Sequence, residues 1–591
     1  MEAFNPFSDY ARKGWLWNLL RGDNPLSFGW GAFLFSIGLL MIAGHFLAKR
    51  GWAKGDRFAA SSILILFGLL SLFVLFPIGK IVLVAFGSAT HFMGLQVLLN
   101  TITLAICVSL GTTLVGLVFA LLVHRSRYTR AKPIWNLFST LPLITPPFVV
   151  GLSLIFLLGR SGFITNHLLG IETNTIIGFP GLVLAQIFSF APVSFMILLH
   201  VLRGIDPTLE EASFTLGAGP HHTFRKITWT LLRPGLANAF LLTMIESFAD
   251  FANPIIIGGD YHVLSTEIYF SIIGKYDEGL AASLGLILLL STLVVFLLQR
   301  LWLGKRSYVT VTGKPQGRVL ICLPPLLDKI LVTFGGLWSV ATFALYIFFF
   351  AGAFVKIWGI DFTFTLEHFA QFQIDGLDSF YTSVALGLVA APFATFLGLF
   401  IAYFTHRQRF RGRVFMEFIS LLNFAVPGTV ISLGYLLAFN KGPISMTGTA
   451  SILVFCFVFR NMAVGIRAGV SQLAQMDVSL EEASLLLGGN LIQTGKRILL
   501  PLMRGAVITS LSYSFVRSIT AISAIIFLVS AEWNLATKVI LDRIEYGRLG
   551  VATAYCTLLV FVMGVILKCL ETRNFGNANV SDTYGCQRKS N

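Results

Sequence analysis

Long apolar segments separated by short polar ones dominate the chain. Each is long enough for a helix that crosses about 30 Å of hydrocarbon. They lack the alternating ten-residue strands of a membrane barrel. The thirteen segments are 27–48, 58–90, 95–123, 135–158, 180–202, 236–257, 280–303, 327–355, 380–404, 415–438, 449–471, 506–529 and 549–570. The pattern predicts an all-α polytopic membrane protein with about 12–13 transmembrane helices.

Two polar stretches interrupt this pattern, and they are copies of each other. Asp206–Leu236 and Asp477–Val507 align without a gap at an offset of 271 residues and are identical at twelve of thirty-one positions. The similarity extends outward, because 98–127 also aligns with 380–409, including a shared His-Arg pair. The chain therefore contains an internal duplication, and we expect two pseudo-symmetric six-helix repeats with one extra helix in front.

Each polar copy is expected to form two short helices. Asp206 and Asp477 have the residue type that caps a helix N-terminus. Gly217 and Gly488 come just after the last good helix formers, where a left-handed residue commonly ends a helix. Membrane packing alone does not explain why these polar residues recur at one spacing.

The repeated loop resembles the cytoplasmic coupling loop of permease subunits in binding-protein-dependent ABC importers. The resemblance rests on a Glu-Ala pair, a later Gly and a Leu-Pro pair. The second copy has the Leu-Pro pair at Leu500–Pro501, whereas the first copy has Trp229–Thr230 at that place. It covers nearly the whole chain after about residue 58 and implies a type I ABC importer permease fold. Two repeats fused in one chain look most like the ferric-ion permease family and its relatives.

This resemblance implies partners and a role for the loops. A homodimer of separate ATP-binding subunits would dock at the cytoplasmic face, and a periplasmic substrate-binding protein would deliver cargo outside. ATP and Mg would be used by that ATPase, with no cofactor bound by this chain, in a bacterial inner (plasma) membrane. The residues expected to couple to the ATPase are Glu210, Glu211, Ala212, Gly217, Glu481, Glu482, Ala483 and Gly488.

The repeats divide the sequence into five predicted parts. An interfacial segment and extra transmembrane helix (1–57) precede the first repeat (58–303), which contains coupling loop 204–236. A cytoplasmic linker (304–326) leads to the second repeat (327–572), which contains coupling loop 475–507. A polar tail (573–591) follows.

Composition supports a membrane protein and sets its orientation. The 591 residues are 55% hydrophobic and 12% charged, with a mean hydropathy of +0.80 and a net charge of +15. In a membrane protein such a basic excess is first a topology signal, and no nucleic-acid partner is expected. The basic loops 124–132, 304–318 and 406–413 should be cytoplasmic, which places both coupling loops on that side. Thirteen spans would put the N-terminus outside.

The chain lacks the motifs of an enzyme or a metal site. Gly489–Arg497 approaches a phosphate-binding loop but has a misplaced glycine and no Ser or Thr for magnesium. The six cysteines are scattered without metal-ligand spacing. His221–His222 have Ile492–Gln493 as their counterparts, so they are interpreted as surface residues. We expect no catalysis and no metal site, so the energy must come from another subunit.

Polar residues within the apolar spans indicate a substrate path or gate, because ionisable groups in a membrane are costly. At the 271-residue offset Glu246 matches Arg517, so the two could form a gating ion pair, or each could extend to the cytoplasmic interface. The candidate path residues are Glu246, Asp250, Asn253, Arg517, Thr520 and Ser523.

The cargo stays open between two candidates. The segment ESFADF resembles ferric permeases and favours iron. Arg517 stands where those permeases usually carry Glu, and a guanidinium favours an anion such as a sugar phosphate or phosphonate. An ion-coupled secondary transporter is the alternative of another class, since it also has repeats and midplane charges. Its repeats are often inverted, whereas both copies here share one orientation.

Overall fold

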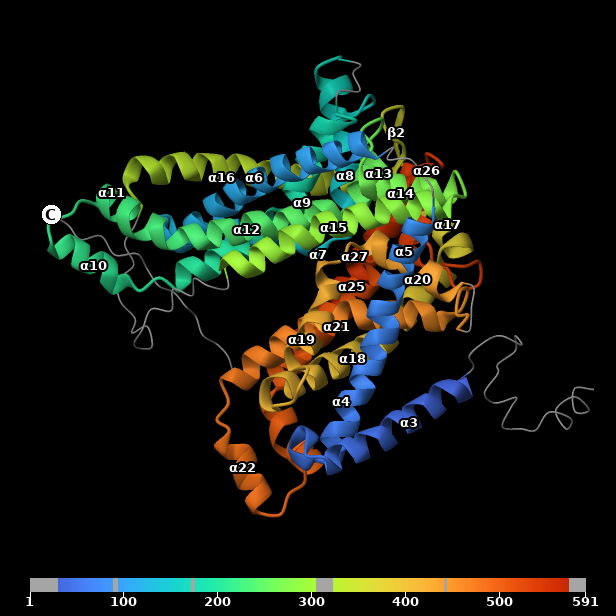
Figure 1. Cartoon of the computed structure of the whole chain (residues 1–591). Helices are drawn as coiled ribbons and strands as arrows, with labels where there is room; N and C mark the ends of the chain where they lie inside the picture. Colours follow the sequence, from blue (N-terminus) through green and yellow to red (C-terminus); the bar gives the residue numbers. More distant parts are fainter. Residues whose placement is uncertain (1–29, 89–93, 172–175, 304–322, 441–443, 573–591) are drawn as a thin grey trace, which may run out of the picture. The chain divides into compact units, whose positions relative to one another are not determined.

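The computed structural model describes residues 30–88, 94–171, 176–303, 323–440 and 444–572 (Figure 1). Three predicted features lie outside these ranges: the interfacial segment before residue 26, most of the linker and the polar tail. The described helices form two compact units, each built from several stretches of the chain.

Unit 1 contains Met1–Thr90, Lys275–Leu286 and Asp378–Lys538. Its N-terminal elements are α3 (Trp30–Lys49), η1 (Trp52–Gly55), α4 (Arg57–Leu70), the π-helical turn η2 (Ser71–Leu75) and α5 (Phe76–Gly87). Its later elements are α18 (Leu377–Arg407), α19 (Arg413–Ala425), α20 (Gly428–Phe439), α21 (Ala450–Ala474), α22 (Ser479–Leu486), α23 (Leu491–Thr494), the π-helical turn η6 (Gly495–Leu499), α24 (Leu500–Leu502) and α25 (Arg504–Ile519).

Unit 2 contains His91–Gly274, Ile287–Leu377 and Val539–Asn591. Its elements up to residue 223 are α6 (Leu95–Arg125), η3 (Thr129–Ala131), α7 (Lys132–Ile144), α8 (Phe148–Leu158), η4 (Phe163–Leu168), α9 (Phe179–Arg203), α10 (Pro207–Thr215) and α11 (Pro220–Thr223). The later ones are the π-helical turn η5 (Phe224–Thr228), α12 (Trp229–Ala249), α13 (Ala252–Ile257), α14 (Leu264–Ile273), α16 (Pro325–Phe354), α17 (Glu367–Asp375) and α27 (Leu549–Thr572). An antiparallel pair, β1 (Val355–Ile357) and β2 (Asp361–Phe364), follows α16. Helices α15 (Glu278–Leu303) and α26 (Ala536–Glu545) belong partly to each unit.

The packed units do not follow the two sequence repeats. Helices α4 and α5 come from the first repeat but pack in unit 1, where α5 contacts α20. Helix α16 comes from the second repeat but packs in unit 2 against α6, α7 and α8. The first helices of each repeat therefore pack in the unit that contains most of the other repeat's later helices. The boundaries predicted for the five parts of the sequence describe the repeats and not the packed units, and they stay a prediction.

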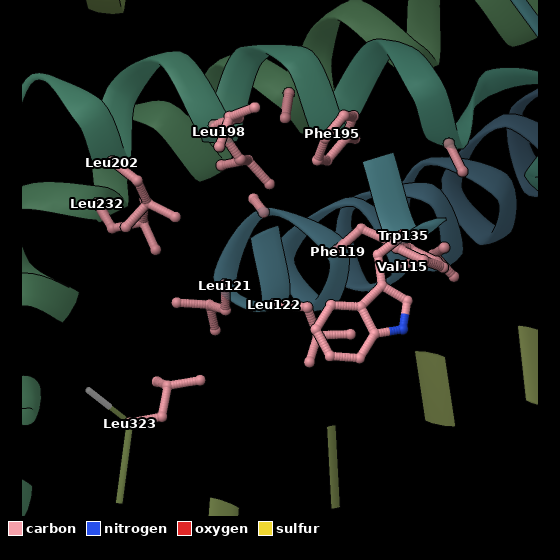
Figure 2. Packing of buried hydrophobic residues seen from close by; sticks show 14 of the residues in the cluster. Val115, Phe119, Leu121, Leu122, Trp135, Phe195, Leu198, Leu202, Leu232 and Leu323 are labelled. Carbon is pink, nitrogen blue, oxygen red and sulfur yellow. The ribbon is translucent and has the colours of Figure 1, made fainter. Parts of the chain in front are cut away.

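A buried apolar cluster joins the helices that surround the first coupling loop. Phe119 and Leu122 of α6 meet Leu198 and Leu202 of α9, and Leu232 of α12 packs against the same group (Figure 2). Each of these side chains is almost fully buried, so van der Waals contacts between closely packed helices hold the group together within the membrane. The cluster thus holds α6, α9 and α12 together where the coupling loop begins.

Unit 1 has an aromatic core at the π-helical turn η2. The ring of Phe73 lies 4.4 Å from that of Phe455 and 4.8 Å from that of Phe459, both on α21. The buried Tyr435 hydroxyl donates a 2.9 Å hydrogen bond to the Phe73 carbonyl oxygen. Stacked aromatic pairs and a satisfied tyrosine hydroxyl fix the position of α4–α5 against α20 and α21.

The all-α membrane class is confirmed, but the count of spans differs from the sequence pattern. Among the described residues nine helices are long and apolar enough to cross a membrane, or up to eleven if two bent pairs each count as one span. Three predicted spans are interrupted: 135–158 breaks between α7 and α8 at Thr145–Pro147, 236–257 breaks at Asp250, and 415–438 breaks between α19 and α20 at Val426–Pro427, where the two helices are bent by 110°. A fourth, 506–529, stays helical only to Ile519. Proline disfavours helix for the preceding residue, which explains the first break.

Candidate coupling loops and membrane path

The first helices of the two predicted coupling loops, α10 and α22 (the coupling helices below), have the same local design. Asp206 Oδ1 accepts a 2.9 Å hydrogen bond from the Thr208 N–H, and Asp477 Oδ1 accepts one of 3.0 Å from the Ser479 N–H. Both predicted N-caps are confirmed. The hydrogen bond from Ser479 holds the pKa of the Asp477 carboxyl below its ordinary value. Negative charge at this end of a helix also interacts favourably with its dipole.

The predicted glycine ends are confirmed as well. Gly217 has φ 83° and Gly488 has φ 80°, in the left-handed region that only glycine adopts at little cost. A hydrogen bond then ties each coupling helix to the short helix after it. Ser213 and Thr223 hydroxyls lie 2.9 Å apart, and those of Ser484 and Thr494 lie 2.8 Å apart. These bonds explain why Ser and Thr recur at the same places in both copies.

A buried ion pair fastens each coupling helix to a long membrane helix. Glu210 Oε1 lies 2.7 Å from Arg125 Nη1 at the end of α6, and both side chains are at most 5% exposed. Glu481 Oε1 lies 2.8 Å from Arg407 Nε at the end of α18. In the sequence, both arginines are part of basic loops and indicate only topology. The aligned His-Arg pair was the signal that could have identified them.

The opposite side of each coupling helix is open. Ala212 and Ala483 are exposed, Glu482 is exposed and Glu211 is half-buried. The large apolar side chains next to the glycines are highly exposed, Leu216 at 88% and Leu487 at 89%, as is the neighbouring Leu486 at 89%. These side chains leave apolar surface open at the end of each helix. Glu210 and Glu481, in contrast, face inward and are not part of this surface.

Two of the predicted path residues meet in a buried polar network at the end of α12. Asp250 Oδ2 accepts hydrogen bonds from Gln186 Nε2 (2.8 Å) and Asn253 Nδ2 (2.9 Å). Its Oδ1 accepts from the N–H groups of Ala252 (3.1 Å) and Asn253 (3.4 Å). Ser247 Oγ donates to Gln186 Oε1 at 2.6 Å. Asp250 thereby satisfies the backbone where the helix breaks, and Gln186 is a member of the network that no sequence pattern predicted.

The second repeat breaks at the matching place with different chemistry. Helix α25 ends at Ile519, and the irregular segment after it is fixed by side chains: Phe527 N–H donates to Ser432 Oγ (3.0 Å) and Thr537 Oγ1 donates to the Ala521 carbonyl (2.7 Å). Non-helical backbone at membrane depth is tolerated where it is buried in protein or lines a polar cavity. Matching breaks in both repeats therefore mark segments of functional interest.

The remaining path candidates are distributed over both units. Glu246 is half-buried on α12 in unit 2, while Arg517 is exposed on α25 in unit 1, with its guanidinium 5.5 Å from the Tyr513 ring centre. Their pairing stays a prediction. Thr520 Oγ1 donates to the Val516 carbonyl at 2.9 Å, and Ser523 follows in the irregular segment. Among the described residues, no three His, Cys, Asp or Glu side chains gather as a metal-binding group.

These features define an integral membrane protein of the type I ABC importer permease fold. A family model for the inner membrane component of binding-protein-dependent transport systems matches residues 112–306. The chain is 40% identical over 564 residues to the ferric transport system permease protein FbpB of Actinobacillus pleuropneumoniae, covering 92% of this chain and 82% of that protein. The chain belongs to this family of binding-protein-dependent permeases.

Two relatives from Haemophilus influenzae also match over most of the chain. The chain is 40% identical over 529 residues to ferric transport permease FbpB 1, covering 86% of this chain and 84% of that protein. It is 23% identical over 483 residues to the Fe(3+)-transport permease FbpB 2, covering 81% and 90%. Relatives that match over both repeats are consistent with a fused two-repeat permease.

Proposed function

We propose that this chain is the transmembrane permease of an ATP-driven, binding-protein-dependent importer of ferric iron in a bacterial inner membrane. The observation that carries the proposal is the pair of coupling loops, which share capping, glycine ends and buried ion pairs. Family membership supports an importer over an ion-coupled secondary transporter. The names of the 40%-identical relatives support ferric iron as the cargo.

The open face of each coupling helix is the surface on which a separate ATPase subunit docks. Leu216 and Leu487 supply the apolar contact, and the left-handed glycine after each one directs the chain away from it. Two equivalent loops fit two copies of one ATPase, which therefore binds as a homodimer. ATP and Mg are used there, and this chain binds neither.

Transport then proceeds by alternating access. A periplasmic binding protein presents the cargo at the outer face, and ATP closes the ATPase dimer. The two coupling helices follow the ATPase, so the membrane helices attached to them open the path outward. Hydrolysis and release return the inward-facing state. The glutamates at 210 and 481 keep each coupling helix attached to its membrane helix during this movement.

A small phosphorylated anion is the second candidate cargo, and Arg517 is the observation that favours it. The side chain is exposed on α25, close to the point where that helix ends. A guanidinium repels Fe(III) and pairs well with phosphate oxygens. In the ferric importer Arg517 lies off the cargo's path and donates a 3.2 Å hydrogen bond from Nε to the Tyr513 hydroxyl.

Uptake into proteoliposomes tests the proposal directly. Vesicles contain this chain and its ATPase, the binding protein is outside, and ferric iron or a sugar phosphate is offered with and without ATP. We expect ATP-dependent iron accumulation. Accumulation of the phosphate ester without iron would transfer the assignment to the second cargo. Uptake that needs no ATPase would contradict the importer itself.

A glycine substitution pair tests the coupling surface. Gly217→Val and Gly488→Val force a branched side chain into positive φ, which costs about 1–2 kcal/mol per site although the space around both is open. We expect weaker ATPase binding and loss of uptake. Gly219→Ala and Gly495→Ala are the matched controls, because a Cβ at either also meets no atom within 4 Å and neither glycine has a left-handed φ.

A further inference from the structure

The helices that carry the buried arginines are equivalent and unusually long. Helices α6 and α18 each have 31 residues, and each ends at its arginine, Arg125 or Arg407. Arg125 and Arg407 hold the coupling helices through Glu210 and Glu481. One end of each long helix is therefore tied to a coupling helix.

The other end of each long helix is tied to the segment after the helix break. Thr101 Oγ1 on α6 donates to the Val97 carbonyl (2.7 Å) and accepts a 2.9 Å hydrogen bond from the buried Leu264 N–H. Ser383 Oγ on α18 donates to the Ser379 carbonyl (2.8 Å) and accepts one of 2.8 Å from the Ala536 N–H. All four hydrogen bonds are buried or partly buried.

The two arrangements occupy corresponding positions in the repeats. Arg125 follows Thr101 by the same 24 residues that separate Arg407 from Ser383. At 1.5 Å per residue, each pair of ties is about 36 Å apart, a distance that spans the hydrocarbon layer. Figure 1 shows α10 and α11 at one end of the bundle of α6, α9 and α12, with α13 and α14 at the other.

Close packing keeps each long helix from sliding on its neighbour. A Cβ on Gly116 of α6 would lie 2.6 Å from Ser194 Cβ and 2.7 Å from the Phe195 nitrogen on α9. A Cβ on Gly398 of α18 would lie 2.5 Å from the Met462 carbonyl oxygen on α21. Helix α18 continues through Pro392 without interruption. Each long helix is thus in close backbone contact with one neighbouring helix near its middle.

We propose that α6 and α18 are rods that carry the movement of the coupling helices to the broken-helix segments. Arg125 and Arg407 are the positioning residues at one end, and Thr101 and Ser383 are those at the other. The proposal rests on the proposed function, because it assumes an ATPase that moves the coupling helices. Its physical basis is a continuous chain of hydrogen bonds and ion pairs in each repeat.

The two arginine ties differ in detail. Glu210 also accepts a hydrogen bond from Thr228, and the equivalent position in the second copy is Leu499. Arg407 instead donates through Nη2 to the Leu473 and Met476 carbonyl oxygens at 3.1 and 2.8 Å. In unit 2 the Glu210 carboxylate makes the additional hydrogen bond, and in unit 1 the Arg407 guanidinium makes the additional ones.

The main test is the amount of cargo transported per ATP hydrolysed by the complete complex in proteoliposomes. Thr101→Val with Ser383→Ala removes both hydroxyl ties and nearly preserves side-chain size. We expect ATP hydrolysis to continue while cargo per ATP falls about tenfold, the scale of one lost buried hydrogen bond. Thr103→Val is the matched control, since Thr103 is exposed on the same helix. Thr101→Ser and Ser383→Thr, which keep the hydroxyl, should couple normally.

The arginine ends are tested by charge reversal. Arg125→Glu and Glu210→Arg should each abolish coupled uptake, and the two together should restore it at least in part. Arg130→Glu, a reversal at an exposed arginine of the adjoining loop, is the control. Variants that transport the same cargo per ATP as the unmodified complex would overturn the rod proposal. An unmodified complex that transports nothing with ATP would instead overturn the proposed function.

A measurement on the unmodified complex tests the proposal even if the variants fail to assemble. The rods should transmit ATP binding to the amide groups at their far ends. We expect hydrogen exchange at Leu264 and Ala536 to change when ATP is added. Equal exchange with and without ATP, in a complex that imports cargo, would refute the rods.

Discussion

Replacing Asp250 by asparagine removes one negative charge and turns one hydrogen-bond acceptor into a donor. Both side chains that contact the Asp250 carboxylate are themselves donors. Gln186 Nε2 and Asn253 Nδ2 both donate to Asp250 Oδ2, so the amide nitrogen of the introduced asparagine would face two donors there. Gln186 cannot turn its amide without losing the 2.6 Å bond from Ser247. The substitution therefore leaves a conflict that only Asn253 can relieve.

Asn253 can turn its amide at little cost. Its Oδ1 is buried and has no hydrogen-bond partner among the described residues, so rotation brings that oxygen to the new amide. One of the two conflicts then disappears. The other costs one hydrogen bond to a charged group, about 1.5–3 kcal/mol of folding free energy. Backbone bonds from Ala252 and Asn253 are kept, because an asparagine Oδ1 accepts them as Asp250 Oδ1 does.

A double substitution makes the reasoning specific. Gln186→Glu alone places a second carboxylate where the Gln186 amide lies 2.8 Å from Asp250, which is strongly unfavourable. Combined with Asp250→Asn, the introduced glutamate carboxylate accepts from the introduced asparagine amide and from Ser247. The double variant should therefore be more stable than the two single effects predict when added together.

The assay is the thermal unfolding midpoint of the detergent-solubilised chain, followed by loss of the monodisperse peak, with ATP-driven uptake measured in parallel. Ser189→Ala is a mild reference, since the bond that Ser189 receives from Asn253 is a long one of 3.5 Å. An Asp250→Asn variant as stable as the original chain would refute the network. A double variant whose unfolding midpoint falls by the sum of the two single decreases would refute the proposed exchange of donor and acceptor between positions 186 and 250.

Three further predictions concern packing and capping. Gly116→Leu should destabilise unit 2 by about 1–3 kcal/mol or more through overpacking, whereas Gly336→Leu, where a Cβ meets no atom within 4 Å, should have little effect on the unfolding midpoint. Tyr435→Phe should cost about 1 kcal/mol by removing the hydrogen bond to Phe73, and equal midpoints would argue against that bond. The cap at Asp477 should act above the ordinary carboxyl pKa and disappear as the pH falls through its lowered value, visible as lower amide protection factors at the start of α22.

The sequence alone determined the class of the protein and the position of its coupling loops. Apolar length requires membrane helices, because unpaired backbone groups are too costly in lipid. The caps at Asp206 and Asp477 and the ends at Gly217 and Gly488 are local properties of a few adjacent residues, so the pattern of residue types was enough to predict them. The 271-residue repeat then made the assignment specific.

The pattern of apolar residues along the sequence predicted some helix boundaries wrongly. The predicted span 236–257 is long enough to cross a membrane, yet the helix stops at Asp250 because its carboxylate accepts the N–H groups that would otherwise continue the ladder. Apolar length measures whether a segment can enter the membrane. It does not measure whether the backbone stays helical across it.

Tertiary structure decided which polar groups meet. Arg125 lies 85 residues before Glu210, and Gln186 lies 64 before Asp250, so no periodicity relates the partners. The exchange of first helices between the repeats is likewise invisible in the sequence, since α5 and α16 would fit either core by hydrophobicity alone. Hydrophobic burial is non-directional, and only the packed backbone brings particular donors and acceptors within hydrogen-bonding distance.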